Sequence, residues 1–97
     1  MSIQSKKTIE QLNNLYNDKM KKRKQKEFIE FVLKKYPPKN NVKTKDFIKI
    51  NNLSKVIEQI LPKYNPNNHK DRYDSIIYNE IYNLLGKMKQ QLFKKNI

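Results

Sequence analysis

The sequence has no cysteine and a single glycine among its 97 residues, and each shortage excludes a class of protein. Without cysteine there is no disulfide framework, no thiolate nucleophile and no cysteine-ligated zinc. With Gly86 alone, and no Asn-Gly or Asp-Gly pair, the chain lacks the residues that tight hairpins require. The length also excludes large barrel and doubly wound enzyme folds. What is left is a small domain without a sheet.

Long apolar runs are absent as well. The longest contain three residues, Phe31-Val32-Leu33 and Ile76-Ile77-Tyr78, whereas a membrane-spanning helix needs about twenty. The first residues lack the apolar stretch of a secretory signal. We therefore expect an intracellular protein that makes no membrane contact.

The residue patterns of common catalytic sites are missing too. His69 is the only histidine, and it lies in a predicted loop, where we expect it to be exposed. There is no Cys-His pair, no phosphate-cradling glycine loop and no HExxH motif. The sequence therefore predicts a protein that is not an enzyme and that holds no cofactor or metal.

The apolar residues that are present recur every three or four positions, which is the period of a helix. The first helical region spans about residues 5–36 and ends at Pro37-Pro38, because proline cannot continue a helix. Residues 21–26 within it are either continuous helix or a joint between two helices. The apolar positions of this region are Ile9, Leu12, Tyr16, Met20, Phe28, Phe31, Val32, Leu33 and Tyr36.

A helical core over about residues 44–95 follows. A short helix capped by Thr44 leads to a corner at Asn51-Asn52, and a second helix carries an unbroken apolar stripe until Pro62 ends or kinks it. The last helix begins near Asp71 or Asp74. Together the periods predict one all-α domain, 1–97, a bundle of about four helices. The two stripes of this core are Leu53, Val56, Ile57, Ile60, Leu61 and Tyr64, then Tyr73, Ile77, Ile81, Leu84, Met88 and Leu92.

Two stretches of the chain resemble each other at an offset of 28 residues. Residues 29–41 read IEFVLKKYPPKNN and residues 57–69 read IEQILPKYNPNNH, with seven identical positions that include the pair Tyr36 and Tyr64. The match predicts two related helix-loop-helix units. A chance match in a chain rich in Lys, Asn and Ile is the alternative.

The strongest functional signal is charge. The chain carries 22 Lys and Arg against 9 Asp and Glu, a formal net charge of +13. Six cations fall within eight residues, and on a helix such neighbours repel one another unless an anion relieves them. Phosphates would do so, since their neutralisation releases counterions. The predicted nucleic-acid-binding residues are Lys19, Lys21, Lys22, Arg23, Lys24 and Lys26, together with Lys55.

Lys55 is predicted to bind nucleic acid because of a different sequence pattern. Residues 44–61 have the helix–corner–helix form of a DNA-reading motif, in which the outward side chains of the second helix would include Ser54, Lys55 and Glu58. An ordinary corner in a bundle is the alternative. Aromatic residues beside lysines, as at Lys35-Tyr36, either stack on unpaired bases or pack in the hydrophobic core.

The sequence as a whole predicts a small, basic, non-enzymatic protein that binds DNA or RNA mainly through phosphate contacts, as a component of a nucleoprotein or transcription assembly. Three alternatives stay open. In the first, the cation block is only a solvated face whose lysines reflect A/T-rich codons. In the second, Lys21-Lys22-Arg23-Lys24 is a nuclear-import signal. In the third, the chain is a helical adaptor that binds a protein partner. The oligomeric state is not predicted.

Overall fold

The computed structural model describes residues 3–38, 52–69 and 75–95, and all regular structure within them is helical. This confirms the predicted all-α fold for that part of the chain. The predicted helix over residues 44–50, and the start of the last helix at Asp71 or Asp74, lie outside the described residues. The elements are α1 (Ile3–Lys21), α2 (Gln25–Lys35), α4 (Leu53–Ile60), the 3-10 turns η1 (Leu61–Tyr64) and η2 (Pro66–His69), and α5 (Ser75–Lys95).

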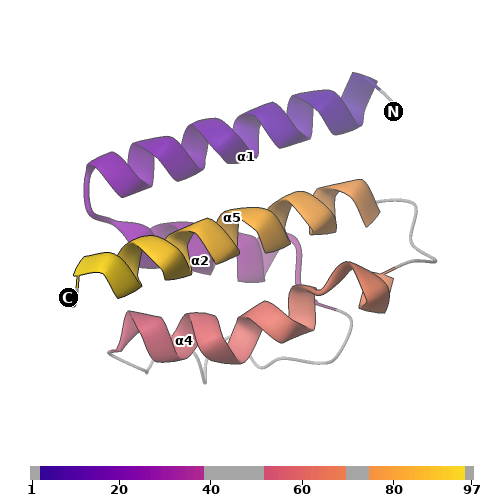
Figure 1. Ribbon diagram of the computed structural model, residues 1–97. Helices are drawn as coiled ribbons and strands as arrows, with labels where there is room; N and C mark the ends of the chain where they lie inside the picture. The colour runs from indigo at the N-terminus through magenta and orange to yellow at the C-terminus, as the bar shows by residue number, and fades with distance from the viewer. Residues whose placement is uncertain (1–2, 39–51, 70–74, 96–97) are drawn as a thin grey trace.

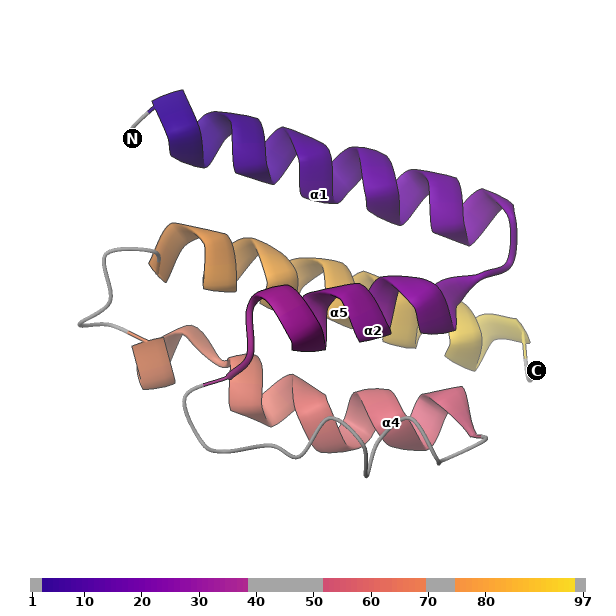
Figure 2. The same ribbon diagram turned by 180° about the vertical axis from the view of Figure 1, so that it is seen from behind.

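Helix α5 is central to the bundle. It packs against α1, α4 and both 3-10 turns, while α2 packs against α1. Helices α1 and α5 run in one direction, and α2 and α4 run in the other (Figures 1 and 2). As a result, the turn from α1 to α2, the start of α4 and the last turns of α5 all lie at the same end of the bundle.

Most of the core is formed by the stripes that the sequence predicts. Ile29, Tyr78 and Leu85 are also buried, although they are not among the predicted stripe residues, and the predicted Tyr73 lies outside the described residues. Helix α2 buries four apolar residues at positions i, i+1, i+4 and i+5, and Phe31 lies to one side of that face. Its side chain is 36% exposed, so its assignment to the apolar stripe is wrong. The buried apolar residues are Leu12, Tyr16, Phe28, Ile29, Val32, Leu33, Val56, Ile57, Ile60, Tyr64, Tyr78, Ile81, Leu84, Leu85 and Met88.

The basic N-terminal region, expected over about residues 5–36, is two helices joined within 21–26. Helix α1 ends in a Schellman motif, in which Lys24 N–H donates to the Lys19 carbonyl (2.7 Å) and Arg23 N–H donates to the Met20 carbonyl (3.2 Å). Arg23 has φ 59°, the left-handed conformation that this motif normally gives to glycine. These bonds reverse the chain, and α2 begins at Gln25.

Helix α4 begins and ends as the sequence predicts. The Asn52 side chain caps it by accepting a hydrogen bond from the backbone N–H of Lys55 at 3.3 Å. The α-helix ends at Ile60, and Pro62 lies in the first turn of the 3-10 segment that follows. A proline is tolerated there because an N–H at that position would have no helical partner.

Residues 65–69 differ from the prediction of a plain loop with an exposed histidine. Asn65 Oδ1 accepts a hydrogen bond from the Asn67 N–H at 3.0 Å, and Pro66–His69 forms the 3-10 turn η2. This turn brings His69 onto α5, where its ring stacks on Tyr78 with centroids 4.1 Å apart. His69 is fully buried, so the prediction of a surface histidine is wrong.

Two tyrosine hydroxyls donate hydrogen bonds to carbonyl groups at and just beyond the end of α2. Tyr64 Oη donates to the Tyr36 carbonyl at 2.8 Å and lies 3.4 Å from the Val32 carbonyl. Tyr78 Oη donates to the Pro37 carbonyl at 2.8 Å. Buried carbonyls without partners are costly, so these hydroxyls fix the end of α2 against α5 and η1.

The two tyrosines of the 28-residue match have unequal surroundings. Tyr64 is fully buried at the end of η1, and Tyr36 is half-buried as the C-cap of α2. Much of the compared stretch, residues 39–51 and 70–74, lies outside the described residues. The two related helix-loop-helix units therefore stay a prediction.

Candidate nucleic-acid interface

The predicted cation block occupies the turn between α1 and α2. Lys21, Arg23 and Lys26 are exposed, and no ion pair involves them within the part of the chain that the structure describes. The Schellman hydrogen bonds hold the backbone of this turn, so the cations are displayed from a defined conformation and not from a loose loop. We call Lys19, Lys21, Lys22, Arg23, Lys24 and Lys26 the turn cluster.

The other three members of the turn cluster form ion pairs. Lys19 Nζ lies 3.1 Å from Glu27 Oε1, Lys22 Nζ lies 3.1 Å from Asp18 Oδ1, and Lys24 Nζ lies 3.9 Å from Glu27 Oε2. Because most of these groups are well exposed to solvent, each pair contributes little to stability and can open toward another anion. The two carboxylates leave the turn with an excess of four positive charges.

The fold adds two lysines that sequence spacing does not connect with the turn. Asn13 Nδ2 of α1 donates to Glu80 Oε1 of α5 at 3.1 Å, which fixes the two helices at an offset of 67 residues. Both helices run in the same direction (Figure 1) and rise equally per residue. The same offset places Lys87 and Lys89 about level with residues 20–22. Lys87 is exposed and Lys89 is half-buried.

Lys55 lies at the same end of the bundle as the turn cluster, but in another layer. It is exposed in the first turn of α4, and α5 lies between α4 and α1 (Figures 1 and 2). Of the expected outward residues, Glu58 is exposed and Ser54 is half-buried. The first helix of the helix–corner–helix motif falls outside the described residues, so this second binding element stays a prediction.

The aromatic residues divide between core and surface. Tyr64 and Tyr78 are buried, as the core interpretation expects, whereas Tyr36 and Tyr82 are half-buried. Burial raises the pKa of Tyr64 far above its ordinary value, with the nearby Tyr78 hydroxyl adding to the rise. Burial also raises the pKa of Tyr16. The buried hydroxyls therefore stay neutral at physiological pH and act as packing and hydrogen-bonding groups.

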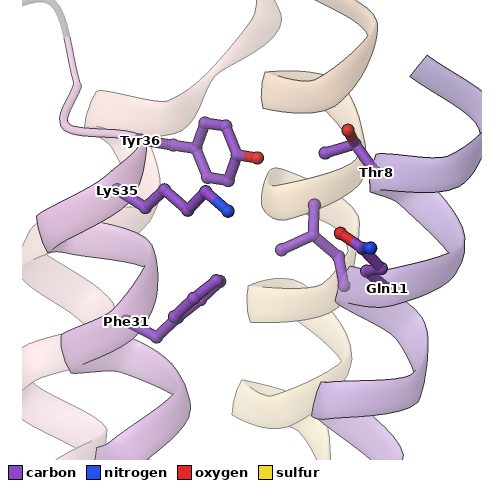
Figure 3. A pocket seen from close by; sticks show the side chains of 6 residues that line it. Thr8, Gln11, Phe31, Lys35 and Tyr36 are labelled. Carbon is purple, nitrogen blue, oxygen red and sulfur yellow. The ribbon is translucent and has the colours of Figure 1, made fainter. Parts of the chain in front are cut away.

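A shallow groove lies between α1 and α2, toward the ends of these helices that are far from the turn cluster. Phe31, Lys35 and Tyr36 of α2 face Thr8 and Gln11 of α1 across it (Figure 3). The hollow has an empty volume of about 190 Å³ including its open mouth. It is smaller than the roughly 300–1,000 Å³ of pockets that enclose drug-sized molecules.

Comparison of the chain with profiles of known families, with curated proteins and with solved structures finds no significant match. None of the helices within the described residues is long and apolar enough to cross a membrane. In that same part of the chain, no three His, Cys, Asp or Glu side chains are grouped to hold a metal ion. The candidate site is the turn cluster, because most of its cations are exposed.

Proposed function

We propose that this protein binds DNA or RNA through phosphate contacts made by the turn cluster. The observation that carries the proposal is that Lys21, Arg23 and Lys26 are exposed, without ion pairs among the described residues, on a turn whose backbone is fixed by hydrogen bonds. Phosphates are the ligands that such cations attract, because each neutralised phosphate releases counterions. Lys87 and Lys89 extend the positive end of the bundle along α5.

The conformation of Arg23 supports a functional role for the turn. A left-handed backbone costs an L-residue about 1–2 kcal/mol, and glycine would avoid that cost. Strained backbone conformations cluster at binding and catalytic sites, where the surrounding structure holds them in place. An arginine in this place provides a planar, permanently charged group that can bind a phosphate with two hydrogen bonds.

The adaptor alternative has less support from the surface. Among the described residues, the large apolar side chains that are exposed are Phe31 on α2 and Ile76 on α5. Interfaces between proteins usually bury a cluster of such residues at their centre. We therefore favour a polyanionic partner, with assembly into a larger nucleoprotein complex as the setting in which the phosphate contacts act.

The proposal is tested by titrating the wild-type protein into fluorescently labelled single-stranded and duplex oligonucleotides at several salt concentrations. With four to six phosphate contacts, log K should fall linearly with log salt with a slope of roughly −3 to −5. Unrelated sequences should bind with similar affinity, because phosphate contacts do not read bases. If no binding is measurable even at low salt, the proposal fails and the adaptor alternative becomes the favoured function.

A further inference from the structure

The groove between α1 and α2 combines an exposed aromatic ring with a cation. Phe31 is among the most exposed large apolar side chains of the described residues, at 36%. Lys35 Nζ lies 5.5 Å from the centre of the Phe31 ring and 5.8 Å from the centre of the Tyr36 ring. These distances are within cation–π range. The ammonium group is thus held beside two rings that are open on the groove side (Figure 3).

The opposite wall of the groove is suited to a flat polar ring. It is formed by Thr8, Gln11 and Leu12 of α1. Leu12 supplies an apolar floor, and the exposed Gln11 amide can both donate and accept hydrogen bonds. A planar group with mixed donors and acceptors at its edge could stack on Phe31 and meet Gln11 with that edge.

We propose that this groove is a stacking site for one unpaired nucleobase of a single strand whose phosphates lie on the turn cluster. The inference rests on the proposed function and extends it from phosphate contact to single-strand preference. Base–aromatic stacking is tolerant of sequence because every base has a π-face. Lys35 lies beside the stacked base and can neutralise its phosphate.

The spacing along α2 fits one continuous strand. From Lys26 to Phe31 the helix advances about 7.5 Å at 1.5 Å per residue. A stacked strand covers that distance in about two nucleotides, at 3.4 Å per step. The phosphates at one end of this segment would meet the turn cluster, and the base at its other end would meet Phe31. Charge favours this occupant over a neutral peptide, because the exposed Lys35 lines the groove.

The test compares two single-ring deletions. Phe31→Leu removes the proposed stacking ring and keeps an apolar side chain, and Tyr82→Leu removes a half-buried ring of α5 that does not line the groove. The probes are a labelled oligothymidine of about twelve nucleotides, within the usual site size for single strands, and an abasic strand of the same length. Anisotropy titrations give the affinities, and circular dichroism checks that both variants keep their helices.

We expect Phe31→Leu to weaken oligothymidine binding roughly tenfold or more, in line with the loss of one stacked base. The salt slope should not change, because no charge is removed. Binding of the abasic strand should be unaffected by Phe31→Leu, and Tyr82→Leu should change neither affinity by more than about twofold.

Other outcomes overturn the inference in distinguishable ways. If wild type binds both strands equally, or if Phe31→Leu changes nothing, the stacking site is refuted and phosphate binding stands. If Tyr82→Leu weakens oligothymidine as much as Phe31→Leu does, the ring at the groove is not special. If an acidic peptide containing tyrosine binds the wild type and its binding is weakened by Phe31→Leu, while oligothymidine binding is not weakened by that substitution, the groove is a protein-docking site. If wild type binds neither strand, the proposed function itself fails.

Discussion

Replacement of Arg23 by glycine should stabilise the protein and weaken its binding. Arg23 has φ 59° at the C′ position of the Schellman motif. An L-residue in this conformation costs about 1–2 kcal/mol, while glycine loses roughly 0.5–1 kcal/mol more backbone entropy on folding than an ordinary residue. The difference predicts a net gain of about 0.5–1 kcal/mol. For a domain of this size, that raises Tm by roughly 2–8 °C.

Two control variants separate the backbone effect from the charge effect. Arg23→Ala removes the same charge and keeps the left-handed strain, so its stability should stay near that of wild type. Lys21→Gly makes a similar change two residues earlier, inside right-handed α1, and should cost up to about 1 kcal/mol. Both Arg23 variants should flatten the salt dependence of nucleic-acid binding by about 0.7–0.9, the value for one phosphate contact.

The assays are urea unfolding followed by circular dichroism and binding titrations over a range of salt. A fall in stability of more than about 0.5 kcal/mol for Arg23→Gly would refute the left-handed turn. An equal rise for Arg23→Ala would show that the gain comes from lowering the net charge. Unchanged binding by both variants would mean that Arg23 makes no phosphate contact.

Three further predictions concern the core. Tyr64→Phe should lower the free energy of unfolding by about 1–3 kcal/mol, since it leaves the Tyr36 carbonyl without its partner. Tyr16→Phe should change it by less than about 0.5 kcal/mol, because the Tyr16 hydroxyl is buried without a hydrogen-bond partner among the described residues. Equal costs for the two variants in urea unfolding would contradict this prediction. Burial raises the pKa of both tyrosines above the ordinary value of 10.0, so the unfolded chain ionises first as the pH rises. Their contribution to stability is therefore complete below about pH 10 and falls as the pH rises above it. Tyr64→Phe should make that fall shallower, and a steeper fall would be inconsistent with a buried neutral hydroxyl. Ile57→Ala should cost about 2–4 kcal/mol as a fully buried residue, and a cost under about 0.5 kcal/mol would place this stripe outside the core.

The helical periodicity of the sequence predicts most of the fold because amphipathic patterning and proline stops act locally. The stripe of α4 and its end at Pro62 follow from spacing alone. The joint within residues 21–26 does not, because no glycine or proline marks it. There the Schellman turn forms on an arginine, and the packing of Phe28 against Tyr16, with ring centroids 5.5 Å apart, holds α2 against α1.

The candidate site is only partly predictable, because part of it depends on how distant segments pack together. The turn cluster is contiguous in sequence, so its charge density is visible there. The level of Lys87 and Lys89 relative to the turn depends on the offset between α1 and α5, which the Asn13–Glu80 hydrogen bond indicates across 67 residues and composition does not reveal. The burial of His69 does not follow from the local sequence, because it depends on stacking against Tyr78 of α5. The exposure of Phe31 depends on which face of α2 meets the core.

The salt dependence of nucleic-acid binding by two triple variants tests the central claim most directly. One variant replaces Lys21, Arg23 and Lys26 by Gln, and the control replaces Lys6, Lys34 and Lys63, which lie away from the turn. Both remove three positive charges, so any effect of net charge alone is the same. The turn variant should flatten the slope of log K against log salt by about two to three units, and the control by less than about one. Equal slopes for the two variants would contradict a binding site at the turn between α1 and α2.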